Sequence, residues 1–286
     1  MLIDTHAHLF WDSYKEDFDQ VLKNAENAGL STIINIGCDI ESSQKCADLQ
    51  STNPNVKFYS SISIHPEAAI HYFNNEEQIE KDIKQLEQIY LNNKDKVIAV
   101  GECGLDFAYA NWEGYLPDNI TKDMMKNLQR KLFQAQINLA KKLDLPLLLH
   151  IRDDRSENPD LIECWDEVFQ MAGDHYGILH CYSGLEQTTK RAIDSNFLVS
   201  FAGNLTYKKN EYLKEAVKML PLEKIVVETD CPFLPPQSIR GKRNEPSSVL
   251  EIAHYIAEIK GISFEEVASQ TTLNAKKMLR MQANSS

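Results

Sequence analysis

The chain has 286 residues, of which 43% are hydrophobic, so it can bury a large core in one or two domains. Its 42 acidic residues outnumber its 30 lysines and arginines, and the net charge of -12 argues against a protein that coats nucleic acid through a basic surface. A small phosphate-binding pocket whose positive charge comes from metal ions is compatible with this composition.

The start of the chain and its cysteines indicate the compartment. Residues 1–8 lead directly into a strand pattern, without the basic and apolar regions of a signal peptide. No apolar stretch approaches the length of about 20 residues that a membrane-spanning helix needs. The 6 cysteines form no C-x-x-C pair, which favours reduced thiols. We therefore expect a cytoplasmic protein, with the nucleus as the alternative.

Strand-like and helix-like patterns alternate along the chain, which is typical of parallel strands joined by helical crossovers. The predicted strands cover residues 2–5, 31–37, 56–64, 96–101, 146–150, 176–180, 197–201 and 225–229. The predicted helices cover residues 15–29, 41–52, 76–92, 122–143, 158–172, 186–195, 210–220 and 246–260. Eight such units predict an α/β fold, a TIM-type (β/α) barrel that forms a single domain over residues 1–286. An amphipathic segment at 264–281 predicts an extra C-terminal helix on the outside of the barrel.

Five short apolar runs each end in side chains that bind divalent metals. His6 and His8 share one face of the first strand, because side chains alternate along a strand. The later runs end in one candidate ligand each: Glu102, His150, His180 and Asp230. Barrels of this type carry their sites at the C-terminal ends of the strands, so we expect these groups to converge. An open doubly wound sheet, the alternative, would gather its site at one switch point instead.

The number of candidate ligands predicts two divalent cations, because it exceeds the number of protein ligands in an open catalytic zinc site. We expect Glu102 to bridge the two ions, since each oxygen of one carboxylate can bind a different ion. His6, His8 and Asp230 are assigned to one ion, and His150 and His180 to the other. The four imidazoles favour zinc, manganese or iron.

Two further carboxylates are expected beneath the metals, because Asp4 lies two residues before His6 and Glu228 two residues before Asp230. We expect Asp4 to accept the second N–H of the His6 imidazole and so to orient the ring. A buried salt bridge with no link to the metal is the alternative.

His65 ends the third predicted strand, directly before Pro66. We expect it to contact substrate, as a hydrogen-bond donor or as an acid for the leaving group, with a turn or capping role as the alternative. Arg152 is predicted to bind an anionic group of the substrate. The remaining rim cations, which are equally compatible with solvated surface, are Arg155, Lys208, Arg240, Lys242 and Arg243. The aromatic segment 106–121 is predicted to form a lid or wall over the active face, and the alternative is that its aromatic side chains only pack the loop onto the body of the protein.

These residues belong to motifs that follow one another along nearly the whole chain. The motifs are Asp4–His8, His65-Pro66, Gly101–Asp106, Pro146–Arg152, His180–Gly184, Glu228–Leu234 and Arg240–Pro246. In this order and spacing the chain resembles the TatD deoxyribonucleases, metal-dependent hydrolases of the amidohydrolase superfamily. It departs from the family pattern in a longer segment 106–121, which leaves the substrate preference open, and in Ser63-Ile64 where a glycine is common.

The resemblance implies a TIM-type barrel, a metal site built from the six candidate ligands, and nuclease activity on DNA, supported by magnesium and directed at 3′ ends. In the mechanism that we expect, Asp230 takes the proton of the attacking water, while His65 and Arg152 hold the phosphate. The acidic surface favours a single strand or an end over a long duplex. Hydrolysis of an amide, lactone or aminoacyl ester is one alternative, and a noncatalytic binding scaffold is another. The sequence makes no prediction about oligomeric state.

Overall fold

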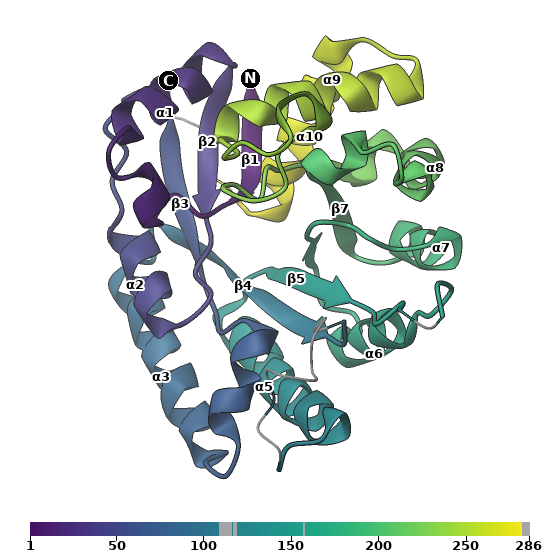
Figure 1. Ribbon diagram of the computed structural model, residues 1–286. Helices are drawn as coiled ribbons and strands as arrows, with labels where there is room; N and C mark the ends of the chain where they lie inside the picture. Colours follow the sequence, from purple (N-terminus) through teal and green to yellow (C-terminus); the bar gives the residue numbers. More distant parts are fainter. Residues whose placement is uncertain (109–115, 117–118, 157, 282–286) are drawn as a thin grey trace.

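Eight parallel strands form the centre of the molecule in the computed structural model, which describes residues 1–108, 116, 119–156 and 158–281 (Figure 1). The strands are β1 (Leu2–Ala7), β2 (Leu30–Asn35), β3 (Lys57–Ile62), β4 (Val97–Asp106), β5 (Leu147–Arg152), β6 (Gly177–Leu179), β7 (Phe197–Phe201) and β8 (Ile225–Val227). Each strand pairs with the next one in the sequence, from β1 to β8. The predicted TIM-type barrel is therefore confirmed.

The junction between β8 and β1 is made differently from the other junctions. The described part of the chain has one isolated parallel bridge there, between Ala7 and Cys231. Two backbone hydrogen bonds accompany it, from His8 N to Cys231 O at 2.9 Å and from Asp230 N to His6 O at 2.9 Å. The ends of the chain's first and last strands consequently lie side by side, although no regular ladder joins them.

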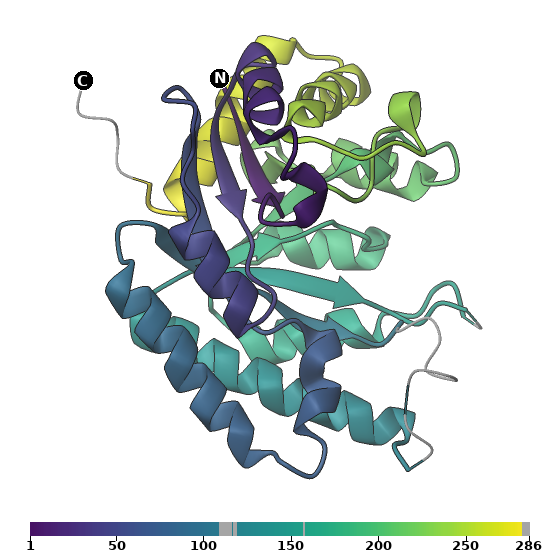
Figure 2. The same cartoon turned by 60° about the vertical axis from the view of Figure 1, so that its left-hand side comes forward.

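Helices surround the strands on their outer side, as the two views show (Figures 1 and 2). They are α1 (Phe18–Asn27), α2 (Ile40–Asp48), α3 (Glu77–Asn92), α5 (Lys122–Leu143), α6 (Glu163–Ala172), α7 (Glu186–Asp194), α8 (Glu211–Met219), α9 (Val249–Lys260) and α10 (Phe264–Met278). None of the helices in the described ranges is long and apolar enough to cross a membrane.

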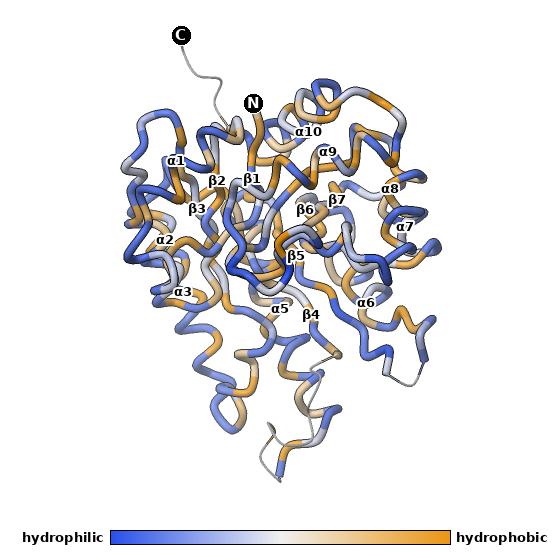
Figure 3. The backbone as a smooth tube through the Cα atoms, turned by 45° about the horizontal axis from the view of Figure 1, so that its top comes forward, coloured by the Kyte–Doolittle hydropathy of each residue, from blue (hydrophilic) through white to orange (hydrophobic). Residues whose placement is uncertain are grey.

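The core has an inner and an outer part. Each strand contributes a buried apolar side chain to the inner cluster, for example Leu148 and Ile178, and a larger cluster packs between the strands and the helices. Figure 3 shows hydrophobic colouring along the central strands and hydrophilic colouring on many outer turns. Leu148 and Ile178 face the barrel interior, so alternation places His150 and His180, two residues later, on the same face.

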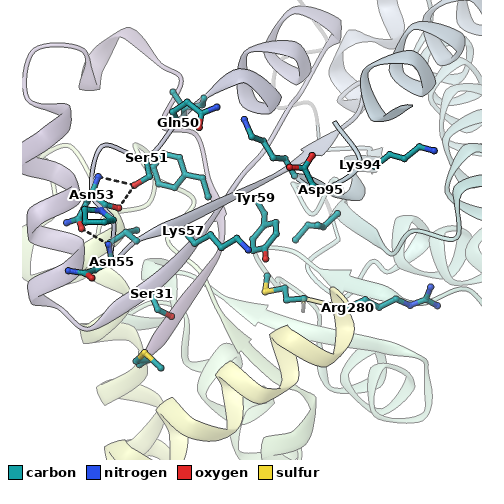
Figure 4. Close-up of a pocket in the computed structure, with 18 residues that line it drawn as sticks. Ser31, Gln50, Ser51, Asn53, Asn55, Lys57, Tyr59, Lys94, Asp95 and Arg280 are labelled. Atoms are coloured by element: carbon teal, nitrogen blue, oxygen red, sulfur yellow. Dashed lines mark hydrogen bonds between the residues drawn. The ribbon is translucent and has the colours of Figure 1, made fainter. Parts of the chain in front are cut away.

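The predicted C-terminal helix is present as α10, and it does more than cover the outside. Ala275 belongs to the inner cluster, as does Leu279 just beyond the helix, so the end of α10 closes the base of the barrel. A hollow of about 790 Å³ lies beside it, at the N-terminal ends of β2, β3 and β4 (Figure 4). Lys57 lies over the ring of Tyr59 in this hollow, with Nζ 4.5 Å from the ring centroid. The candidate ligands lie at the opposite ends of the strands.

Two element boundaries differ from the prediction for identifiable reasons. β4 continues to Asp106, beyond the predicted end at residue 101, because its residues keep pairing with β5 up to Arg152. α6 begins at Glu163 instead of residue 158, and its Cys164 N–H is capped by Asp153 Oδ1 at 2.7 Å, from far outside the helix. Most of the segment predicted to be a lid, residues 109–115 and 117–118, lies outside the described residues.

Candidate metal centre

The C-terminal ends of the strands bring all six predicted ligands together. His6 lies in β1, and His8 comes just after it. Glu102 lies in β4 and His150 in β5. His180 follows β6, and Asp230 follows β8. Four of them, His6, His8, Glu102 and His180, are almost fully buried. The side chains of His150 and Asp230 are partly exposed, at 18% and 13%, so these two ligand candidates reach water.

The first set of donors surrounds the end of β1. His6 Nε2 lies 3.3 Å from His8 Nε2 and 3.3 Å from Glu102 Oε2. Asp230 Oδ1 lies 3.4 Å from His8 Nε2 and 3.7 Å from His6 Nε2. One ligand atom each from His6, His8 and Glu102 lies within 4.8 Å of the others. This spacing lets a single ion reach all three.

The second oxygen of Glu102 faces a different set of imidazoles. Glu102 Oε1 lies 2.7 Å from His150 Nδ1, 3.3 Å from His180 Nε2 and 3.5 Å from His65 Nε2. Burial alone would raise the pKa of Glu102, but the surrounding histidines, His180 first, hold it well below its usual range. The carboxylate is therefore ionised, with one oxygen toward each set.

His180 lies between the donors around His6 and the donors around His150, so it contacts both sets. Its ring stacks on the ring of His6, with centroids 3.5 Å apart and an interplanar angle of 21°. Together with Asp230, His6 and His180 form a second group whose ligand atoms lie within 4.8 Å of one another. The sequence did not reveal this stacking, because it depends on how β1 and β6 tilt across the barrel.

His65 joins Glu102 and His150 in a third group with the same spacing. Its Nδ1 accepts a hydrogen bond from the Glu67 backbone N–H at 3.3 Å, at the start of a short 3-10 helix, Pro66–Tyr72. This bond directs Nε2 toward Glu102. The predicted capping role and a position facing the site therefore occur together in one side chain.

Asp106 is a buried carboxylate at the site, and the sequence pattern does not single it out as a site residue. Its Oδ2 lies 2.9 Å from His150 Nε2, so His150 is flanked by Asp106 and Glu102. Burial alone would lower the pKa of His150, but the hydrogen bonds to Asp106 and Glu102 outweigh it and raise the pKa to about 10. The available signal was the final position of the Gly101–Asp106 motif, which β4 carries up to the site.

The two carboxylates expected beneath the metals behave differently from each other. Glu228 is fully buried, and its Oε1 lies 2.8 Å from His180 Nδ1 and accepts a hydrogen bond from the Cys181 N–H at 2.7 Å. It therefore directs His180 Nε2 toward the cluster.

Asp4 accepts hydrogen bonds from the backbone N–H of His6 at 3.2 Å, from the Thr229 N–H at 2.9 Å and from the Thr229 hydroxyl at 2.6 Å. Burial raises the pKa of Asp4 to about 8. Asp4 thus holds the backbone that leads to Asp230, and the predicted bond to the His6 imidazole is replaced by these contacts.

Among the predicted rim cations, Arg152 is the one next to the site. Its side chain is 51% exposed, and Nη1 lies 3.9 Å from Asp106 Oδ2. Arg155 instead donates to Ser183 O at 2.8 Å and Leu161 O at 3.2 Å, which ties two loops together. Arg243 pairs with Asp17 and Glu245, and Arg240 lies over a tyrosine ring. These three arginines support the loops around the site.

The chemistry of the donor set fits divalent cations. Burial, reinforced by the neighbouring His180, lowers the pKa of His6 to about 3, so its imidazole is neutral and has a lone pair to give. The pKa of His150, about 10, means that a cation that binds there has to displace a proton. His8 Nδ1 lies 3.3 Å from the Ile36 carbonyl oxygen, which can only accept, so a proton on Nδ1 leaves the Nε2 lone pair toward the cluster. Imidazole nitrogens mixed with carboxylate oxygens suit zinc or manganese, and the carboxylates also suit magnesium.

Comparisons with known proteins agree with this architecture. The family model described as "TatD related DNase" matches residues 3–280. A Bacillus subtilis protein, "Uncharacterized metal-dependent hydrolase YabD", is 35% identical over 98% of this chain and 100% of its own length. The human protein "Deoxyribonuclease TATDN3" is 30% identical over 97% of this chain and 94% of its own length. The crystal structure of the TatD homologue YJJV from Escherichia coli superimposes with a TM-score of 0.80 at 24% identity, covering 98% of both chains.

Proposed function

This chain belongs to the TatD family of metal-dependent hydrolases, and on that premise we propose that it is a deoxyribonuclease that hydrolyses phosphodiester bonds at the 3′ ends of DNA. The observation that carries the proposal is the placement of Glu102, whose two oxygens face two sets of imidazoles. Two cations that share a carboxylate suit phosphodiester hydrolysis, in which both the attacking and the leaving oxygen need stabilisation. The human relative named a deoxyribonuclease supports DNA as the substrate.

We assign one divalent cation to His6, His8, Glu102 and Asp230, and a second to Glu102, His150 and His180. Such cations supply Lewis-acid chemistry, which lowers the pKa of water and neutralises charge on phosphoryl oxygens. Magnesium, manganese and zinc are the candidates. His180 borders both sets, and Glu228 holds it in place through Nδ1.

Asp230 is the proton acceptor in this proposal. Its Oδ1 lies within 4.0 Å of three imidazole nitrogens, from His6, His8 and His180, and its side chain is 13% exposed. It can therefore reach both the cluster and an incoming water. A carboxylate at hydrogen-bonding distance from the attacking water takes up the proton that the water loses.

Two side chains at the mouth are assigned to the phosphate. His65 presents Nε2 to the site because its Nδ1 is engaged by Glu67, so it can donate to a nonbridging oxygen or protonate the leaving oxygen. Arg152 is exposed and close to Asp106, and its guanidinium can bind two phosphate oxygens at once. The net charge of -12 favours a single strand or an end, since duplex binding depends on many backbone contacts.

Digestion of end-labelled oligonucleotides tests the proposal. Single- and double-stranded DNA, labelled at the 3′ or the 5′ end, is incubated with the protein in magnesium, manganese or zinc, with and without EDTA. We expect stepwise loss of nucleotides from the 3′ end that EDTA abolishes. Activity that EDTA leaves unchanged, or no cleavage in any divalent metal, would overturn the proposal. A parallel panel of amides, lactones and aminoacyl esters tests whether the site cleaves another bond.

A further inference from the structure

Two exposed aromatic rings lie together at the mouth of the barrel. Trp11 follows β1 and Phe233 follows β8, and each is 44% exposed. Their ring centroids are 5.3 Å apart and their planes meet at 88°. Phe10 adjoins this pair, with its centroid 6.3 Å from that of Trp11. Large aromatic side chains usually bury most of their area, so this grouping on the surface requires an explanation.

The rings adjoin the candidate ligands directly. The centroid of His8 lies 6.1 Å from that of Phe233 and 6.0 Å from that of Phe10. Phe233 comes three residues after Asp230, and its backbone N–H donates to Asp230 O at 2.9 Å. A molecule that rests on these rings therefore reaches the metal centre with its next chemical group.

The backbone beneath the rings is firmly held. The buried Asn244 side chain donates to Phe233 O at 2.7 Å and to Thr229 O at 2.9 Å. The Tyr14 hydroxyl donates to Asn244 O at 2.6 Å, which connects the loop of Trp11 to the loop of Phe233. Phe233 is thus held on the segment that presents Asp230, and the Tyr14 hydrogen bond ties the loop of Trp11 to that segment.

The perpendicular arrangement leaves flat surface available. In an edge-to-face pair one ring contributes only its edge, so its partner covers neither of its faces. Bases of single-stranded nucleic acid stack on such aromatic faces whatever their sequence. Inside a duplex, both faces of a base are already covered by its neighbours, whereas an unpaired base has its faces free for the platform.

We propose that Trp11 and Phe233, with Phe10 next to Trp11, form a stacking platform for an unpaired nucleobase next to the phosphodiester that is cleaved. This inference rests on the proposed nuclease function and specifies its substrate as a single strand or a frayed end. A nucleotide unites the two chemistries that lie side by side here: a flat aromatic base and, one sugar away, an anionic phosphate for the metal centre.

The test compares two single-stranded oligonucleotides, one intact and one with a tetrahydrofuran abasic nucleotide beside the cleaved phosphate. The wild type should prefer the intact substrate. Trp11→Ala and Phe233→Ala should each raise KM for it about tenfold, a value within the range expected for loss of one stacked base, and should lose the preference over the abasic substrate. Trp11→Phe and Phe233→Tyr keep a ring and should retain the preference.

A matched control and a second measurement keep the two proposals separable. Leu91→Ala removes a side chain that is 43% exposed on α3, away from the site, and should leave KM and kcat unchanged. Wild type that cleaves no oligonucleotide would overturn the nuclease function. In that case the anisotropy of a fluorescein-labelled oligonucleotide still measures its affinity for wild type and for the alanine variants. Unchanged KM and substrate preference in an active enzyme, or equal affinities in an inactive one, would overturn the platform.

Discussion

Replacing Glu228 by glutamine tests whether this buried carboxylate tunes the metal centre. Glu228 is fully buried, lies 2.8 Å from His180 Nδ1, and accepts a hydrogen bond from the Cys181 N–H. Burial alone would lower the pKa of His180, but Glu228 and Glu102 raise it to about 9. Glutamine keeps the volume and can keep the bond to Cys181, but it removes the charge that makes the imidazole more basic. Loss of such an outer partner costs metal affinity about tenfold or more, which is roughly 1.4 kcal/mol.

The assay titrates metal into protein stripped by EDTA and follows both bound metal and hydrolysis. We expect Glu228→Gln to need about ten times more metal for half occupancy, with a urea midpoint close to that of the wild type. Asp82→Asn is the matched control, because Asp82 is a hydrogen-bonded carboxylate on α3 that contacts Tyr72 and Gln78, away from the site. Metal affinity of Glu228→Gln within twofold of the wild type would refute the assigned role.

The remaining predictions concern stability, backbone geometry, substrate binding and metal removal. Leu148→Ala should cost about 2–5 kcal/mol in urea unfolding, because Leu148 is 1% exposed inside the barrel; a loss below about 1 kcal/mol would contradict this packing. Gly104→Ala should reduce bound metal and the thermal midpoint, since a Cβ there would lie 2.1 Å from His150 O at a φ of +141°; wild-type metal content would argue against this. Arg152→Ala should raise KM for oligonucleotides about tenfold while kcat changes little, as steady-state kinetics will show; a fall in kcat alone would contradict a binding role. Removal of metal by EDTA should lower the thermal midpoint, and metal at about 100 times its Kd should restore about 2.7 kcal/mol; a midpoint that does not respond to metal would place the ligands elsewhere.

The sequence predicted the parts of this site that depend on strand ends. His150 and His180 follow apolar strands whose alternation fixes the inward face, and the parallel barrel then gathers these ends at one mouth. Local patterns carry this information because a strand keeps its alternation whatever surrounds it. The same logic placed Glu228 next to the cluster.

Contacts between distant loops were not predictable in this way. The stacking of His180 on His6 and the pairing of Asp106 with His150 depend on how the strands lie against each other in space. By sequence Arg155 is a rim cation that could bind phosphate, but its guanidinium donates to the carbonyl oxygens of Leu161 and Ser183. Every residue has a backbone carbonyl, so the sequence does not show which carbonyl accepts a hydrogen bond from an arginine. The folded structure is needed to identify it.

The junction between β1 and β8 links the lifetime of a bound cation to the local dynamics of the barrel. Its backbone pairing is an isolated bridge. The segment that follows β8 is held by side-chain hydrogen bonds, from the Thr229 hydroxyl to Asp4 and from the Asn244 side chain to Thr229 O. Few backbone hydrogen bonds must break for β1 and β8 to separate locally, so we expect this junction to open more often than the junctions between the other strands. Such opening would part His6 and His8 from Asp230. The rate at which a cation escapes from these ligands would then depend in part on the hydrogen bonds of Thr229 and Asn244, neither of which is a ligand.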